Sequence, residues 1–167
     1  VPREEATIVL AVDVSRSMKA TDVLPTRLDA ARAAAREFLA EVPEKFRVGV
    51  VSFATRAAVG VVPTEDRSLV EAALDSLVPG EGTALGDAVA LSLQVGRREE
   101  RAERGEKQEP PPRAILVVSD GARDGGRVEP DRAAALAKEQ GVPVYSVLVG
   151  TGDGVVEEML PGGLRRI

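Results

Sequence analysis

Three stretches of this chain are almost continuously apolar and rich in β-branched residues, which limits how it can fold. They are TIVLAVDVS at residues 7–15, AILVVSDG at residues 114–121 and VPVYSVLVGTG at residues 142–152. Strands buried on both faces of a parallel sheet have this pattern, whereas strands with one face in water alternate apolar and polar residues. The chain is therefore predicted to contain a parallel sheet with the first of these strands near its centre.

Segments with helical periodicity separate the buried strands. Apolar residues recur at helical spacing in residues 28–42, 69–77, 85–95 and 130–141. Thr64 and Asp66 are candidate capping residues before the second of these helices, and Pro130 suits the first turn of the last one. Strands that alternate with helices in this way indicate a doubly wound α/β sheet with helices on both faces.

One segment interrupts the alternation. Residues 46–63 show two β-like halves joined around Thr55 and Arg56, which predicts a hairpin whose second strand lies at an edge of the sheet before Pro63. The predicted fold class is thus α/β: a Rossmann-like three-layer sandwich with a mostly parallel central sheet and one antiparallel edge strand.

Two segments lack a clear apolar pattern. Residues 97–113 are charged and then proline-rich, which predicts the solvated end of a helix followed by an exposed loop. Residues 153–167, DGVVEEMLPGGLRRI, show no complete further element. A chain of 167 residues suits one hydrophobic core, so we expect a single domain over residues 1–167.

Composition excludes several classes of function. The chain has no Cys and no His, so disulfides, thiol chemistry, Ser-His-Asp catalysis and zinc sites built from Cys or His are excluded. The net charge is -5, and the arginines are interleaved with acidic residues, which argues against nucleic-acid binding. No apolar run reaches the roughly 20 residues needed to span a bilayer, so we expect this stretch of chain to be soluble.

Polar residues follow the buried strands. Asp13 and Asp120 lie at the carboxyl ends of two of them, where ligands bind in doubly wound sheets. Asp13, Ser15 and Ser17 follow one another at a spacing of two residues, so the three side chains can point into one concavity. Thr83 stands in PGEGTALGDAV, where glycines allow close approach to the cleft, and Gly86 would let the following helix pack closely against the sheet.

These side chains suit a hard cation. Carboxylates and hydroxyls favour Mg²⁺, with Mn²⁺ or Ca²⁺ as alternatives. Two carboxylates balance one dication, and hydroxyls add ligands without charge, so a bound ion could still attract another anionic oxygen. We therefore predict a site that binds the carboxylate of another protein. Its expected metal-binding residues are Asp13, Ser15, Ser17, Thr83 and Asp120.

The segment DVSRS resembles the Asp-x-Ser-x-Ser signature of von Willebrand factor type A domains. Thr83 in GTALGDA and Asp120 in VVSDG match the threonine and second aspartate of the metal-ion-dependent adhesion site of that family. The resemblance covers residues 7–152 and keeps the five positions in order. It implies a vWA-like fold and a metal-dependent protein-binding module for adhesion or assembly that is not an enzyme.

The resemblance also implies roles for the individual residues. Ser15 and Ser17 would coordinate the metal directly, and Thr83 or one of the aspartates would do so according to the state of the domain. Asp13 and Asp120 would otherwise act through bound water, and an Asp or Glu of a partner protein would complete the coordination shell.

A longer segment, DVSRSMKATDVLPTRLDAAR at residues 13–32, looks like the bacterial membrane-anchored branch related to aerotolerance-operon proteins. This likeness implies a membrane-anchored parent protein with the domain placed outside the cytoplasm. Family members usually close with a C-terminal helix, whereas this chain stops at GGLRRI. We therefore expect the closing helix to be absent and the apolar surface it would cover to favour self-association.

Two other functions remain open from the residues. A haloacid-dehalogenase-like Mg²⁺-dependent phosphatase would use Asp13 as nucleophile, with Asp120 and Asp124 holding the ion. Such an enzyme would need an acid/base carboxylate two residues after the nucleophile, where this chain has Ser15. A structural scaffold that never binds a ligand in trans is the second alternative.

Overall fold

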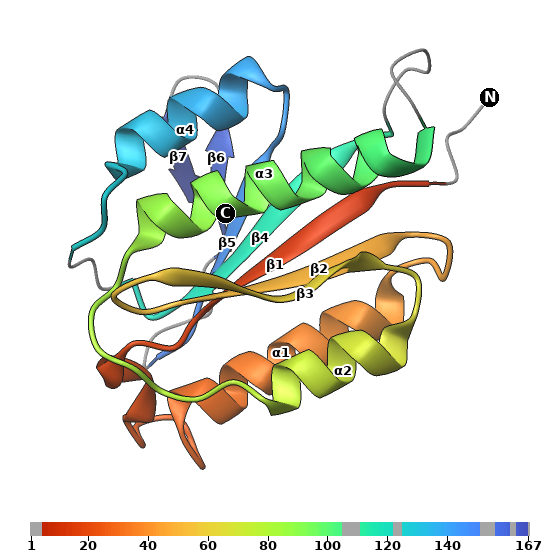
Figure 1. Ribbon diagram of the computed structural model, residues 1–167. Helices are drawn as coiled ribbons and strands as arrows, with labels where there is room; N and C mark the ends of the chain where they lie inside the picture. The colour runs from red at the N-terminus through yellow and green to blue at the C-terminus, as the bar shows by residue number, and fades with distance from the viewer. Residues whose placement is uncertain (1–4, 105–110, 122–124, 151–155, 161–162, 167) are drawn as a thin grey trace.

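A seven-stranded sheet forms the middle layer of the described part of the chain (Figure 1). The computed structural model describes residues 5–104, 111–121, 125–150, 156–160 and 163–166. The elements in chain order are β1 (Thr7–Asp13), the 3₁₀ helix η1 (Arg16–Lys19), α1 (Arg27–Glu41), β2 (Arg47–Phe53), β3 (Ala57–Thr64), α2 (Arg67–Asp75), α3 (Leu85–Arg104), β4 (Arg113–Ser119), α4 (Pro130–Glu139), β5 (Val144–Leu148), β6 (Val156–Leu160) and β7 (Gly163–Arg166).

The order of strands across the sheet is β3-β2-β1-β4-β5-β6-β7. The four strands β2, β1, β4 and β5 are mutually parallel, and β3 runs antiparallel at the edge beside β2. Helices α1 and α2 cover one face of the sheet, and α3 and α4 cover the other (Figure 1). The predicted α/β class, the Rossmann-like three-layer arrangement and the antiparallel edge strand are confirmed.

Strand β1 lies at the centre of the parallel strands, as its apolar pattern predicted. Asp13 pairs with Phe53 of β2, and Val12 pairs with Val118 of β4. Because these three strands are parallel and in register, the segments that follow them emerge at the same edge of the sheet. This edge carries all the residues that the sequence singled out for metal binding.

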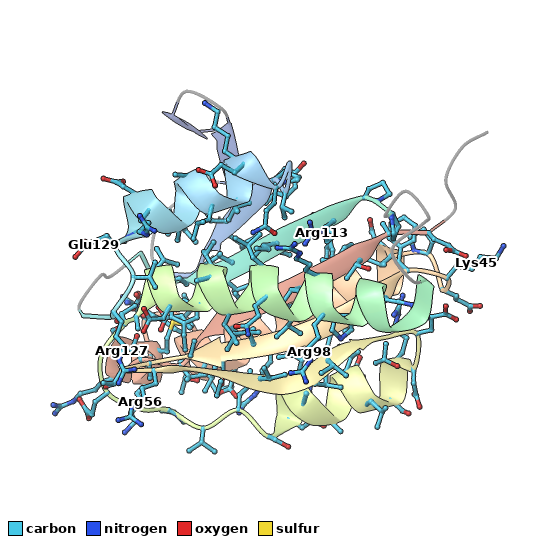
Figure 2. The ribbon with its side chains drawn as sticks, turned by 45° about the horizontal axis from the view of Figure 1, so that its top comes forward. Lys45, Arg56, Arg98, Arg113, Arg127 and Glu129 are labelled. Carbon is cyan, nitrogen blue, oxygen red and sulfur yellow. The ribbon has the colours of Figure 1, made fainter. Side chains whose placement is uncertain are left out.

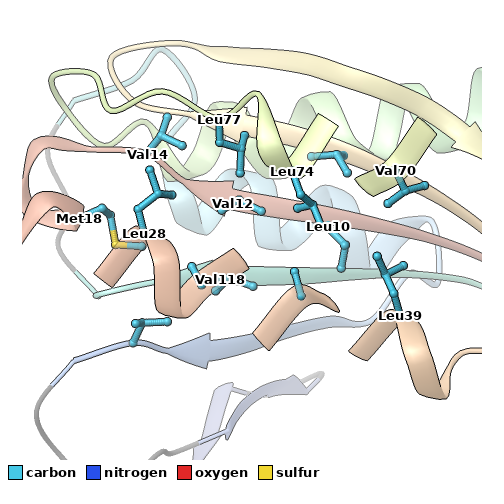
Figure 3. Close-up of a cluster of buried hydrophobic side chains, with 14 of the residues drawn as sticks. Leu10, Val12, Val14, Met18, Leu28, Leu39, Val70, Leu74, Leu77 and Val118 are labelled. Atoms are coloured by element: carbon cyan, nitrogen blue, oxygen red, sulfur yellow. The ribbon is translucent and has the colours of Figure 1, made fainter. Parts of the chain in front are cut away.

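Two apolar clusters hold the layers together. The cluster under α1 and α2 is built largely from Leu and Val, which suits a chain with 2% aromatic residues. Its members include Leu10, Val12, Val14, Met18, Leu28, Leu39, Val70, Leu74, Leu77 and Val118 (Figure 3). On the other face, α3 and α4 contribute small residues such as Ala88, Ala133 and Ala137, which lets their backbones lie close to the sheet.

Local hydrogen bonds set where the helices begin. The Thr26 hydroxyl accepts a hydrogen bond from the Asp29 N–H at 3.1 Å and caps α1. Asp66 caps α2 by accepting from the Ser68 N–H at 3.0 Å, which confirms one of the two predicted capping residues. The other, Thr64, accepts instead from the Asp66 N–H at 3.1 Å and so positions the capping residue.

Helix α3 continues to Arg104, which agrees with the solvated helix end predicted at the start of residues 97–113, because the Arg, Glu and Ala residues there favour helix without any apolar face. The prediction of no further element in residues 153–167 was wrong, since β6 and β7 extend the sheet there. β6 pairs antiparallel with β5, so the edge of β5 supplies backbone hydrogen bonds that a sequence pattern does not reveal.

Among the described residues, no helix combines the length and the apolar content that crossing a bilayer requires.

Gly86 lets the start of α3 pack closely against the loop before α4. The sequence had predicted close packing of this helix against the sheet instead. A Cβ atom at residue 86 would lie 1.8 Å from the carbonyl oxygen of Val128. We expect Gly86→Ala to lower the free energy of unfolding by about 1–3 kcal/mol, because backbone atoms must move to admit the methyl group. Urea unfolding followed by circular dichroism measures this loss.

Gly96 in the same helix provides the control, because a Cβ there would meet its nearest neighbour at an ordinary 3.7 Å. Gly96→Ala should leave the stability unchanged or raise it by up to about 1 kcal/mol, as alanine favours helix. Equal effects of the two substitutions would contradict a role for close approach at residue 86.

Candidate metal centre

The carboxylate of Asp13 is fully buried where β1 ends, with 0% of the residue exposed. One oxygen, Oδ1, accepts a hydrogen bond from the Ser15 N–H at 2.8 Å. The other, Oδ2, accepts from the Ser119 hydroxyl at 2.6 Å. Ser119 is the last residue of β4, so the pairing of β1 with β4 places this donor beside the carboxylate.

The two serines of the DVSRS segment lie together next to Asp13. Ser15 is buried in extended conformation and precedes η1, and Ser17 lies within η1. The buried side chain of Met18 holds this turn of helix against the core. The Ser15 and Ser17 hydroxyl oxygens are 3.0 Å apart. The chain thus turns more tightly than a regular strand, and the predicted convergence of the two hydroxyls is preserved.

Asp120 follows Ser119 and is held by an arginine from the first helix. Its side chain is 2% exposed, and its Oδ2 accepts a hydrogen bond from Arg27 at 2.9 Å. The other two nitrogens of this guanidinium contact the two carboxylate oxygens of Asp22, at 2.7 and 2.9 Å. The hydrogen bonds to Asp22 and Asp120 raise the pKa of Arg27, so this cation is permanent.

Thr83 lies in a loop that is bonded to the ends of β1 and β2. The Gly80 N–H donates to the Val14 carbonyl at 2.6 Å, and the Ala84 N–H donates to the Ala54 carbonyl at 2.7 Å. Thr83 is 4% exposed, and no described residue forms a hydrogen bond with its hydroxyl. A buried hydroxyl without a partner is unfavourable, so this group has capacity left for a ligand.

The surroundings disfavour the charged form of Asp13. Burial is the main cause that raises the pKa of this carboxyl, and the nearby charge of Asp120 adds to it. Hydrogen bonds from Ser119 and Ser15 oppose the shift without cancelling it. The negative charges of two buried carboxylates repel each other, and a cation near both would reduce this repulsion. The pair Asp13 and Asp120 therefore favours binding of a divalent metal ion.

The donor set fits Mg²⁺ in chemistry, since it offers carboxylate and hydroxyl oxygens and no soft ligand. Within the described ranges no three acidic, imidazole or thiol side chains gather into one potential metal cluster. Any metal at this edge would therefore depend on the hydroxyls of Ser15, Ser17 and Thr83 as well as on the carboxylates.

Two residues of this region were given no role by the sequence. Ser119 precedes Asp120 in VVSDG, and only the adjacency of β1 and β4 shows that its hydroxyl reaches Asp13. Arg27 opens α1, and its contact with Asp120 spans 93 positions of sequence, which no local pattern reveals. Asp124, named for the phosphatase alternative, lies outside the described residues.

Known proteins share this architecture. A curated relative, a UPF0353 protein of Mycolicibacterium vanbaalenii, is 40% identical in an alignment 167 positions long that covers 94% of this chain and 48% of the relative. The chain thus spans about half the length of the curated relatives it matches.

Two solved structures are similar over 97% of the chain. BatB from Bacteroides thetaiotaomicron superposes with a TM-score of 0.74 at 28% identity over 75% of its own chain. An aerotolerance-related membrane protein from Bacteroides fragilis superposes with a TM-score of 0.73 at 30% identity over 77% of its chain. The von Willebrand factor type A domain family matches residues 8–122. The chain therefore belongs to the von Willebrand factor type A domain family.

Proposed function

We propose that this domain is a metal-dependent protein-binding module that captures a partner carboxylate through Mg²⁺ at the carboxyl edge of its sheet. Von Willebrand factor type A domains are typically protein-interaction and adhesion modules, generally without enzymatic activity. The observation that supports the metal-dependent part is that buried oxygen groups converge at one sheet edge, above all the carboxylate of Asp13 and the hydroxyl of Thr83, which has no hydrogen-bond partner among the described residues.

Five residues of this chain would hold the ion. Ser15, Ser17 and Thr83 contribute neutral oxygens, and Asp13 and Asp120 contribute charge, directly or through water. When bound, Mg²⁺ supplies a positive centre that can accept one further oxygen from outside the chain. Mn²⁺ and Ca²⁺ prefer similar ligands and are expected to substitute.

The partner is a protein that presents an Asp or Glu side chain. Ser15 and Thr83 add ligands without adding negative charge, so an anionic oxygen is a favourable last ligand. Arg27 takes up part of the charge of Asp120 and works in the same direction. Charge neutralisation within the site therefore favours a carboxylate over a neutral amide.

A phosphatase is less compatible with the geometry. Asp13 would have to act as nucleophile, but the residue is fully buried and both its carboxylate oxygens accept hydrogen bonds. Attack on phosphorus needs an oxygen that faces the substrate. Ser15 stands where an acid/base carboxylate would be required.

The parent protein is proposed to be anchored in a bacterial membrane with this domain outside the cytoplasm. The support is the likeness to an aerotolerance-related membrane protein and the fact that the curated relatives are about twice as long as the matched segment. Additional chain in a longer protein would have room for an anchor.

Metal binding is tested by isothermal titration calorimetry with MgCl₂ and MnCl₂. The wild-type chain should bind one ion, and Asp13→Asn and Ser15→Ala should each weaken binding at least about tenfold, since each removes a ligand or its charge. Ser76→Ala, at an exposed serine that caps the end of α2, is the control and should bind like wild type. Undiminished binding in both site variants would contradict the assignment, and no binding by the wild type would favour a structural scaffold.

The burial of Asp13 predicts a pH-dependent stability without metal. Because the folded-state pKa of Asp13 lies above its ordinary value of 3.8, the folded chain binds the proton more readily than the unfolded chain. Ionisation of Asp13 therefore opposes folding near pH 7. This loss of stability becomes smaller as the pH is lowered from 7 toward 3.8, because Asp13 of the folded chain becomes protonated. In EDTA at pH 7, Asp13→Asn should raise the urea midpoint, and the gain should shrink at lower pH.

The control for this experiment is Asp75→Asn, because the Asp75 side chain is 65% exposed and pairs with Arg36 at the surface. It should shift the urea midpoint little at either pH. A lower midpoint for Asp13→Asn than for wild type at pH 7 would show that lost hydrogen bonds outweigh the relieved charge.

Arg27 is predicted to stabilise the fold through Asp120. Arg27→Gln removes the cation from a carboxylate that is 2% exposed, so we expect the free energy of unfolding to fall by roughly 1–3 kcal/mol. Arg36→Gln is matched, since Arg36 also lies on α1 and contacts two acidic residues, but its side chain is 41% exposed. Its loss should stay below about 1 kcal/mol. If both substitutions lowered the free energy of unfolding equally, the burial of Asp120 would not explain the contribution of Arg27 to stability.

A further inference from the structure

We propose that a groove beside the metal centre binds a second carboxylate of the same protein partner through Arg56 and Arg127. This inference rests on the proposed function, because it specifies the partner as an acidic segment and not a single acidic residue. The metal would take one side chain of that segment, and the groove would take another a few residues away.

The groove has a volume of about 440 Å³ and three walls. The turn of the β2–β3 hairpin contributes Arg56, the first turns of α3 contribute Asp87 and Leu91, and the loop before α4 contributes Arg127. Figure 2 shows Arg56 and Arg127 at the same end of the molecule. The lining between these charged groups includes small apolar side chains that suit the methylene groups of Asp or Glu.

Both arginine side chains are exposed, and no described carboxylate pairs with either guanidinium. Arg27 and Arg36, in contrast, each contact two acidic residues of the chain. The charged residues that line the groove are these two arginines and one acidic residue, Asp87, so the lining carries a net positive charge in a protein whose net charge is -5. Charge complementarity therefore favours an anionic occupant, and a guanidinium fits a planar carboxylate with two parallel hydrogen bonds.

Asp87 also lines the groove, and its carboxylate already accepts hydrogen bonds from the backbone. Its Oδ1 accepts hydrogen bonds from the N–H groups of Arg127 and Val128, at 2.8 and 2.7 Å. It lies in the first turn of α3, where the helix dipole stabilises a negative charge. Asp87 thus holds the backbone of Arg127 at the groove wall.

The groove and the metal centre share one loop. The hairpin turn that carries Arg56 is bonded to the Thr83 loop through the Ala84 N–H and the Ala54 carbonyl, at 2.7 Å. The Thr55 hydroxyl donates to the Glu81 carbonyl of the same loop. Helix α3 begins two residues after Thr83 and carries Asp87 into the groove wall. An extended peptide advances about 3.3 Å per residue, so the proposal requires acidic residues a few positions apart within one segment of the partner.

Two labelled synthetic peptides of equal length test this proposal by fluorescence anisotropy in low-salt buffer with Mg²⁺. One peptide carries a single central Glu in a Gly-Ser background, and the other carries Glu at every second position. The wild-type chain should prefer the acidic peptide. Arg56→Gln with Arg127→Gln should reduce that preference by about threefold to tenfold, as expected for two exposed ion pairs, and leave binding of the single-Glu peptide unchanged.

The matched control is Arg97→Gln with Arg98→Gln, which removes the same charge from exposed positions farther along α3. Arg98 is labelled in Figure 2. This variant should keep the wild-type preference. An undiminished preference in the groove variant, or an equal reduction in the control, would overturn the groove as a site. Mg²⁺ titration of the groove variant should match wild type, which confirms that the metal centre is intact.

The two proposals fail in different ways. If EDTA leaves binding of both peptides unchanged while the preference still requires Arg56 and Arg127, the groove stands and the metal-dependent function is contradicted. If the single-Glu peptide binds only with Mg²⁺ and the preference does not depend on the two arginines, the metal-dependent function stands and the groove proposal is overturned.

Discussion

The buried carboxyl group of Asp13, enclosed at the end of the central strand, is the constraint on which the rest of this domain depends. Moving an anion out of water is unfavourable, and a folded chain tolerates it only where donors and cations surround it. The Ser119 hydroxyl and the Ser15 N–H provide two donors, and Arg27 neutralises the neighbouring Asp120. The end of β1, the end of β4 and the start of α1 must meet at one edge for this compensation, and the parallel pairing of β1 with β4 brings the first two together.

Much of the fold could be predicted because apolar periodicity reports burial directly. Continuous apolar runs identified β1, β4 and β5, and helical spacing identified the four helices. The missed strands β6 and β7 are short, and β6 depends on the edge of β5 for its hydrogen bonds while β7 depends on the edge of β6. The position of Gly86 was recognised as a place of close approach, but its neighbour, Val128, lies in a loop whose path is set by tertiary packing.

The site was predictable to the extent that its residues follow strands. Asp13 and Asp120 end neighbouring parallel strands, so their proximity follows from strand order, and the spacing of Ser15 and Ser17 keeps their hydroxyls near Asp13. Arg27 could not be predicted, because its side chain reaches Asp120 across the edge from a different layer. In the sequence Ser119 resembles an ordinary strand residue, and only the structure shows that its hydroxyl donates a hydrogen bond to Asp13. Whether these residues bind metal remains a prediction from the resemblance and the chemistry.

The contact between Gly86 and Val128 has a consequence for recognition. It joins the start of α3 to the loop before α4 backbone against backbone, and Asp87 fastens the same loop with two further hydrogen bonds. The hairpin turn on the opposite side is bonded to the Thr83 loop. The conformational entropy of ordering these walls is therefore lost when the domain folds and not when a partner arrives. A preorganised surface of this kind lets weak individual contacts contribute nearly their full free energy to binding.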